Sequence, residues 1–198
     1  RVGQASLIEH ILNGEDVLGI MPTGAGKSIC YQIPAIMFDG VTIVISPLIS
    51  LMKDQVDSLN DVGISSTFIN STLTSNEYGQ VVEGILNNVY KIIYIAPERL
   101  DSEYFTQLLD RIKISMIAID EAHCVSQWGH DFRPSYTRIS SVISSLKNRP
   151  IVSCFTATAT QAVKTDIINL LDLHNPFTLT SGFDRKNLKF YVETPVNK

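Results

Sequence analysis

The chain has 198 residues, and its 16 lysines and arginines are outnumbered by 20 aspartates and glutamates, which gives a formal net charge of −4. This balance excludes a strongly basic nucleic-acid coat protein, although it leaves room for a local basic path. The 44% hydrophobic and 18% charged content is typical of a globular protein and excludes a disordered chain.

The sequence has no features of a membrane or secreted protein. No apolar run approaches the roughly 18 residues that span a bilayer, and the first residues have no signal-peptide layout. The chain does not begin with Met, so we expect a fragment of a longer protein. Cys30, Cys124 and Cys154 form no Cys-x-x-Cys pair, which argues against a disulfide framework or zinc knuckle and favours a reducing cytosol.

Short β-branched runs alternate along the chain with longer amphipathic segments. The predicted strands cover 16–20, 41–46, 67–70, 91–96, 116–120 and 151–156, with late strands at 177–180 and 187–192. The predicted helices cover 27–37, 48–62, 76–89, 102–111, 136–146 and 160–171. Most strands are nearly continuous apolar runs, which is typical of strands covered on both faces. The alternation therefore predicts an α/β fold in which a mostly parallel sheet lies between two layers of helices.

A glycine-containing segment, MPTGAGKS at 21–28, follows the first predicted strand and precedes a predicted helix. Gly24 and Gly26 allow the backbone to turn its N–H groups toward an anion, and the helix adds the positive end of its dipole. Lys27 is placed to reach the β- and γ-phosphates of a nucleotide, and the Ser28 hydroxyl to bind Mg²⁺. Methionine occupies the first glycine position of the strict pattern, so an ordinary glycine turn is the alternative.

A second polar group, Asp-Glu-Ala-His at 120–123, ends the buried strand at 116–120. Two adjacent carboxylates at a strand end are costly unless a cation lies close to them. We expect Asp120 to hold Mg²⁺ opposite Ser28, and Glu121 to accept a proton from the attacking water. His123 would then carry the nucleotide state to a neighbouring surface.

Two other interpretations of this acidic segment are open. The first is a surface Asp-Glu pair with a core histidine behind it. The second is a thiol centre at Cys124, or a zinc site formed by His123, Cys124 and His130, for which no further ligand spacing is present.

Together these segments resemble superfamily 2 helicases of the DEAH-lettered type and, more narrowly, the RecQ family of DNA helicases. The matching segments, in chain order, are 1–4, 21–34, 46–55, 94–100, 126–134, 155–160 and 183–185. Lys186 departs from the family's usual proline. The resemblance covers essentially the whole chain. It implies that residues 1–182 form the first RecA-like lobe of a P-loop NTPase, in three layers, and that 183–198 begin the connection to a second lobe.

The resemblance also implies site residues, which fall into four groups. The nucleotide-binding residues are Arg1, Gln4, Thr23, Gly24, Ala25, Gly26, Lys27 and Ser28, with Gln4 on the adenine edge. The catalytic residues are Lys27, Asp120, Glu121 and His123, and Ser28 and Asp120 hold Mg²⁺. The residues that contact DNA or couple it to hydrolysis are Ser46, Lys53, Gln55, Asn70, Arg99, Trp128, Phe132, Arg133, Thr156 and Thr158.

The implied activity is ATP-driven 3′→5′ movement along single-stranded DNA, with unwinding of forked duplexes in DNA repair and recombination. The expected location is the cytoplasm, at the nucleoid in a bacterium, or the nucleus in a eukaryote. We expect the isolated lobe to be nearly inactive, because the second lobe supplies the arginines that stabilise the transferring phosphate. The aromatic residue that stacks on adenine is also expected upstream of Arg1.

The nucleic-acid residues have chemical roles independent of the resemblance, each with a plainer alternative. Trp128 and Phe132 lie in a polar loop where they would stack on exposed bases, or they cap the core beneath the loop. Lys53 and Arg99 would neutralise backbone phosphates, or they are solvated helix charges. Arg133 would pair with a phosphate or with a carboxylate of the ATP site.

The hydroxyl and amide residues at strand ends are open to two interpretations as well. The Thr156 and Thr158 hydroxyls would bond Asp120 or His123, or they are ordinary strand-end groups. Asn70 would touch the DNA backbone, or it caps the next helix.

Three other functional classes compete with an unwinding motor. They are a translocase on duplex DNA, a small-molecule kinase, and an interaction module that only binds nucleotide.

Overall fold

A computed structural model describes residues 3–182 and Tyr191. The strands are β1 (Val17–Ile20), β2 (Val41–Ile45), β3 (Ser66–Ile69), β4 (Ile92–Ile95), β5 (Ile114–Ile119), β6 (Ile151–Thr156) and β7 (Phe177–Thr180). The α-helices are α1 (Gln4–Leu12), α2 (Lys27–Met37), α3 (Ile49–Asp61), α4 (Ser75–Leu86), α5 (Glu103–Leu109), α6 (Arg138–Ser145) and α7 (Gln161–Leu170). The described residues also form three 3₁₀ helices: η1 (Pro97–Asp101), η2 (Ala122–Val125) and η3 (Pro134–Thr137).

One sheet contains all seven strands in the order β3-β4-β2-β5-β6-β1-β7. Every pairing is parallel; the Ile45 position lies beside Ile95 on one side and Ile119 on the other. The carboxyl ends of the strands therefore share one edge of the sheet, where ligands of open α/β sheets bind. At that edge β6 lies between β1 and β5, so the segments that follow these three strands are neighbours.

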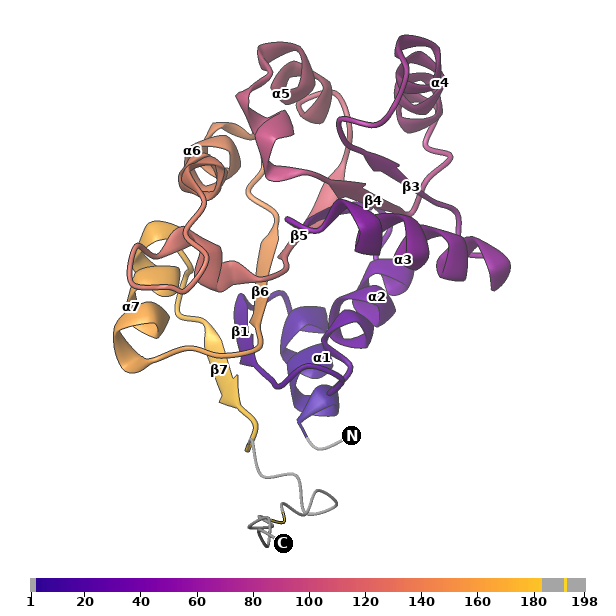
Figure 1. Cartoon of the computed structure of the whole chain (residues 1–198). Helices are drawn as coiled ribbons and strands as arrows, with labels where there is room; N and C mark the ends of the chain where they lie inside the picture. The colour runs from indigo at the N-terminus through magenta and orange to yellow at the C-terminus, as the bar shows by residue number, and fades with distance from the viewer. Residues whose placement is uncertain (1–2, 183–190, 192–198) are drawn as a thin grey trace, which may run out of the picture.

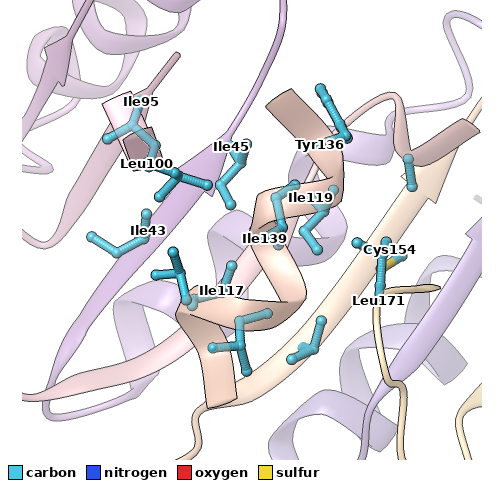
Figure 2. Packing of buried hydrophobic residues seen from close by; sticks show 14 of the residues in the cluster. Ile43, Ile45, Ile95, Leu100, Ile117, Ile119, Tyr136, Ile139, Cys154 and Leu171 are labelled. Carbon is cyan, nitrogen blue, oxygen red and sulfur yellow. The ribbon is translucent and has the colours of Figure 1, made fainter. Parts of the chain in front are cut away.

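Two apolar clusters pack on opposite faces of the sheet, which confirms the predicted three-layer arrangement. Helices α1, α2 and α3 cover one face, through residues such as Leu7, Tyr31 and Met52. Helices α4 to α7 cover the other (Figure 1). Figure 2 shows part of this second cluster, in which Tyr136 and Ile139 lie beside Ile119 of β5.

The observed elements differ from the predicted ones mainly at their ends. Helix α1 was not predicted; it follows Gly3, whose backbone is left-handed (φ 84°), and no side-chain cap marks its start. The predicted helix at 136–146 begins as η3 and becomes α-helical only at Arg138. The predicted strand at 187–192 lies, apart from Tyr191, outside the described residues. Among the described residues, no helix combines the length and apolar character needed to cross a membrane.

The buried carboxylate of Asp16 connects three segments at the edge of the sheet opposite the strands' carboxyl ends. Asp16, just before β1, is 3% exposed and accepts hydrogen bonds from Arg149 (2.6 and 3.2 Å). It also accepts from the backbone N–H groups of Val152 and His174, each at 2.8 Å. Because β6 and the segment before β7 both bond this one side chain, Asp16 holds three segments in register.

Candidate nucleotide and nucleic-acid site

The phosphate-loop segment connects β1 to α2 and has the predicted backbone form. Gly24 and Gly26 adopt φ of 79° and 84°, values that L side chains rarely adopt. The Met21 N–H donates to the Thr156 carbonyl at 2.9 Å, which holds the loop against the end of β6. Gly26 precedes α2 and has no side chain to cap it, so the first N–H groups of the helix are available to an anion.

The Gln4 side chain contacts the backbone of this loop. Its Nε2 donates to the carbonyl oxygens of Ala25 (3.2 Å) and Gly26 (3.0 Å). A Cβ atom at Gly26 would stand 2.5 Å from that nitrogen and would displace the Gln4 side chain, and the positive φ of Gly26 disfavours any other residue there. The amide predicted to contact adenine thus lies against the phosphate loop. Arg1 falls outside the described residues, whereas Thr23 and Ala25 lie in the loop itself.

Lys27 lies between the loop and the acidic segment. Its Nζ is 3.5 Å from the Met21 carbonyl and 3.9 Å from Glu121 Oε1, and its side chain is only 12% exposed. Because both side chains are largely sheltered, water screens the attraction between them poorly. The structure therefore brings two of the predicted catalytic residues together.

The two acidic side chains occupy different electrostatic environments. Burial, followed by the neighbouring Glu121 charge, raises the pKa of Asp120 to about 6. For Glu121 burial also raises the pKa, but the His123 hydrogen bond and the Lys27 charge outweigh it, so the net pKa falls below its usual value. Glu121 has a left-handed backbone (φ 48°), an uncommon conformation for a residue other than glycine. The lowered pKa favours the ionised form of Glu121 at neutral pH, the form that a proton acceptor requires.

His123 links the acidic segment to the end of β6. Its Nδ1 lies 3.2 Å from Glu121 Oε2 and 2.9 Å from Thr156 Oγ1. The Thr156 hydroxyl donates to the Thr158 carbonyl at 3.1 Å, whereas no hydrogen bond links the Thr158 hydroxyl to His123 or Asp120 among the described residues. The His130 ring stacks on His123, with ring centroids 4.2 Å apart. These contacts connect the acidic segment with the loop that carries Trp128.

The positions of Ser28 and Asp120 fit a bound Mg²⁺ ion. Both side chains line one cavity of about 40 Å³, together with Ser46 and Gln55. Carboxylate and hydroxyl oxygens are ligands that Mg²⁺ takes, usually with several waters, and a cavity of this size admits them. Elsewhere in residues 3–182, no three His, Cys, Asp or Glu side chains are grouped as metal ligands, so the zinc alternative lacks a ligand set.

The loop after η2 presents its aromatic residues to solvent. Trp128 is 80% exposed and Phe132 is 37% exposed, so the interpretation of Trp128 as a core cap is wrong. Arg133 forms an ion pair with Asp131 at 3.1 Å and donates to the Pro47 carbonyl at 3.3 Å. In this structure the carboxylate that pairs with Arg133 is therefore that of Asp131, in the same loop, and its pairing with a phosphate or with a carboxylate of the ATP site stays a prediction.

Other residues predicted to touch nucleic acid lie at the ends of β2, β3 and β4. Arg99 donates to the Asn70 carbonyl and lies over the Tyr78 ring, 5.6 Å from its centroid. Asn70 is buried, and its Oδ1 accepts from Thr72. The cap of α4 is Thr74, so the interpretation of Asn70 as the helix cap is wrong.

Residues of α3 and its preceding strand complete this part of the edge. Ser46 is buried directly after β2, and Lys53 is exposed on α3. Gln55, also on α3, accepts a hydrogen bond from Gln32 of α2 at 2.9 Å. Apart from Gln4 on α1, the described residues of the predicted nucleotide and catalytic groups thus follow β1 and β5. Five of the ten predicted nucleic-acid residues follow β2, β3 and β4, three lie in the Trp128 loop, and Thr156 and Thr158 lie at the end of β6.

Sequence reasoning missed a buried polar network next to the phosphate loop. Gln32 Nε2 also donates to the Tyr94 hydroxyl at 3.1 Å, and the Tyr31 hydroxyl contacts those of Tyr94 and Ser28. The available signal was a glutamine within an otherwise apolar face of the helix at 27–37. A buried amide requires hydrogen-bond partners, and tyrosines supply them here.

A parallel sheet with a phosphate loop after β1 and an acidic strand end on β5 defines the chain as a RecA-like P-loop NTPase. The family described as DEAD/DEAH box helicase matches residues 1–166. The chain belongs to this family, which argues against the small-molecule kinase interpretation.

Curated relatives are named RecQ helicases. The chain is 50% identical to the ATP-dependent DNA helicase RecQ of Bacillus subtilis, over 100% of this chain and 34% of that protein. It is 48% identical to RecQ of Haemophilus influenzae, over 98% of this chain and 31% of that protein. The yeast ATP-dependent helicase SGS1 is 40% identical over 97% of the chain and 14% of its own length. The chain thus spans about a third of the bacterial relatives.

Solved helicases share the fold at low sequence identity. The DUF1998 helicase MrfA, bound to DNA and AMPPNP, superposes with a TM-score of 0.72 at 20% identity, covering 91% of this chain and 27% of that one. The Hef helicase domain of Pyrococcus furiosus gives a TM-score of 0.68 at 17% identity, covering 91% of this chain and 37% of that one. These likenesses support the RecA-like fold.

Proposed function

We propose that this chain is the ATP-binding motor lobe of a RecQ-type DNA helicase. Residues 1–182 form the first RecA-like lobe, and residues 183–198 begin the connection to a second lobe. The whole protein binds ATP and single-stranded DNA and couples hydrolysis to 3′→5′ movement and duplex unwinding in repair and recombination. The similarity to RecQ proteins along the whole chain supports this proposal.

One observation carries the proposal: a continuous line of contacts from the phosphate loop to the aromatic loop. Lys27 is 3.9 Å from Glu121, Glu121 is 3.2 Å from His123, and His130 stacks on His123. Loss of the γ-phosphate changes the charge facing Lys27 and Glu121. These side-chain contacts connect that change in charge with the Trp128 loop through the protein.

Each side chain near the phosphate loop has a distinct chemical task. The Lys27 ammonium attracts the β- and γ-phosphate oxygens and offsets the charge that develops on the transferring group. Glu121, ionised at neutral pH, orients a water and accepts its proton. Ser28 and Asp120 would hold Mg²⁺, which when bound offsets negative charge on the phosphate oxygens.

The DNA-facing tasks belong to the aromatic loop and to the ends of β2, β3 and β4. The exposed Trp128 ring is free to stack on an unpaired base, a contact worth about 1–3 kcal/mol per base. Lys53 and Arg99 carry the positive charge that phosphates attract. Because Trp128 stacks only on unpaired bases, its exposure favours single-stranded DNA over the duplex-translocase alternative.

ATP hydrolysis by two forms of the protein tests this proposal. The isolated lobe should bind ATP weakly and hydrolyse almost none, since a second lobe supplies the arginines, an effect worth about 10³–10⁵ in rate in related NTPases. The full-length protein should show hydrolysis stimulated by single-stranded DNA and lost in Lys27→Ala. The proposal would be refuted if ATP hydrolysis by the full-length protein were neither stimulated by DNA nor reduced by Lys27→Ala.

A further inference from the structure

A line of buried polar side chains runs from the phosphate loop to α3 between the sheet and its helices. Ser28 and Tyr31 lie at the start of α2, Tyr94 lies on β4 and Gln55 lies on α3. The Tyr31 side chain lines one cavity with Ser28 and Tyr94, and its hydroxyl interacts electrostatically with theirs. Gln32 Nε2 then donates both to the Tyr94 hydroxyl at 3.1 Å and to Gln55 Oε1 at 2.9 Å.

The central members of this line are buried. Tyr31 is 2% exposed, Tyr94 is 1% exposed and Gln32 is 9% exposed. A buried polar group that loses its partner pays its full desolvation cost, so each hydrogen bond in the line constrains the next. Phenylalanine and leucine would fill the same space without this constraint. Packing alone therefore does not account for these residue types.

The line connects the start of α2 at the cavity that fits a metal ion with helix α3, which also carries the predicted nucleic-acid residue Lys53. Ser28, Asp120, Tyr31, Tyr94 and Gln55 all line the cavity that fits a metal ion. Helix α3 carries Gln55 and the exposed Lys53, both on the nucleic-acid side. Figure 1 shows α2 and α3 side by side on one face of the sheet.

We propose that Tyr31, Tyr94 and Gln32 are positioning residues that couple the state of the nucleotide site to the position of α3. The proposal rests on the proposed function, because it assumes that α3 contacts DNA. A Ser28 side chain that held a metal ion through its oxygen would still have its hydroxyl hydrogen for Tyr31, and would thereby fix the direction of the Tyr31 hydroxyl. The direction of the Tyr31 hydroxyl determines which hydrogen bonds the Tyr94 hydroxyl forms. Because Gln32 bonds both Tyr94 and Gln55, a change at Tyr94 alters the hydrogen bond that positions Gln55. This route is separate from the one through His123.

The test measures coupling between two ligands. Fluorescence anisotropy gives the affinity of the full-length protein for a labelled oligothymidylate, first without nucleotide and then with a non-hydrolysable ATP analogue and Mg²⁺. The ratio of the two affinities is the coupling factor. The test variants are Tyr94→Phe and Gln32→Met, which remove hydrogen bonds with little change in volume. Tyr90→Phe is the control, because Tyr90 packs against the opposite core cluster.

The proposal expects Tyr94→Phe and Gln32→Met each to bring the coupling factor at least about five-fold closer to one, with DNA affinity without nucleotide within two-fold of the unchanged protein. In the double variant the effects of the two substitutions on the coupling factor should not add, because both remove hydrogen bonds from the same line of side chains. Tyr90→Phe should leave the factor unchanged. If Tyr94→Phe does not fold, Gln32→Met decides alone.

Two results would overturn the proposal. One is a coupling factor within two-fold of the unchanged protein in the folded variants. The other is a loss of DNA affinity without nucleotide while the coupling factor holds, which marks a structural role only. A separate failure is also recognisable: if the unchanged protein binds neither nucleotide nor single-stranded DNA, the proposed function itself is wrong.

Discussion

The Nδ1 atom of His123 lies 2.9 Å from the Thr156 hydroxyl oxygen, and both side chains are buried. Thr156 donates its own hydrogen to the Thr158 carbonyl, so its oxygen accepts from His123 and the imidazole carries a proton on Nδ1. The same N–H faces Glu121 at 3.2 Å. The end of β6 thus orients the ring beside the proposed catalytic base.

Thr156→Val removes this hydroxyl but keeps the shape of the side chain. We expect DNA-stimulated ATP hydrolysis by the full-length protein to fall by about ten-fold, because His123 loses its fixed orientation relative to Glu121. The KM for ATP should stay within two-fold. Steady-state kinetics with and without single-stranded DNA measure both quantities, and Thr156→Ser should retain most of the stimulation. Equal losses in Thr156→Val and Thr156→Ser would contradict this role.

Glu121→Gln separates proton transfer from nucleotide binding. The amide keeps the size of the side chain but accepts no proton, so single-turnover hydrolysis should slow by about 10²–10⁴-fold. Binding of a fluorescent ATP analogue should remain, because Lys27 and the loop N–H groups are unchanged. If hydrolysis persists within five-fold, another group accepts the proton.

Asp120→Asn should stabilise the fold at neutral pH, in the absence of nucleotide and metal ions. The folded-state pKa of Asp120 is raised to about 6 from its usual 3.8, mainly by burial, so ionisation of this group costs stability above pH 6. As the pH falls from 6 toward 4, folding takes up a proton and this cost disappears. The free energy of unfolding of the variant should therefore exceed that of the unchanged protein by about 1–3 kcal/mol at pH 8.

Urea unfolding in EDTA measures this difference, which should shrink to nearly zero at pH 4. A difference that is constant between pH 4 and pH 8 would show that Asp120 ionisation does not limit stability. The same variant should lose Mg²⁺-dependent hydrolysis, since an amide is a weaker ligand than a carboxylate.

Asp16→Ala tests the hydrogen bonds that Asp16 accepts at the edge of the sheet opposite the strands' carboxyl ends. It leaves Arg149 and the N–H groups of Val152 and His174 without their acceptor, so the free energy of unfolding should fall by about 3–5 kcal/mol. Chemical denaturation measures the loss. Asp16→Asn keeps two acceptor lone pairs and should lose less. A loss below about 1 kcal/mol for Asp16→Ala would mean that the packing around β1 holds this edge alone.

The strands and most helices could be predicted because their signals are local. Buried parallel strands such as β5 appear as continuous apolar runs, and the glycine pattern at 21–28 marks the turn before α2. Helix α1 escaped prediction because Gly3 starts it without a polar cap. Its apolar pair, Leu7 and Ile11, is too short a pattern to stand out.

Side-chain pairings were harder to predict than the segments that carry them. The segments with Lys27, Glu121 and Thr156 were expected at one edge, because parallel strands end together. The Arg133–Asp131 pair and the Tyr31–Tyr94–Gln32 network were not foreseen. Their members are far apart in sequence or lie within one irregular loop, so no periodic pattern records which atoms meet.

Strand displacement by the full-length protein tests the central claim most directly. The substrate is a duplex with a 3′ single-stranded tail, supplied with ATP and Mg²⁺, and a matched duplex with a 5′ tail is the control. The account predicts displacement from the 3′-tailed duplex alone, lost in Lys27→Ala and strongly reduced in Trp128→Ala. Strand displacement in the absence of ATP would contradict the account. So would the absence of strand displacement by a protein that hydrolyses ATP in the presence of DNA.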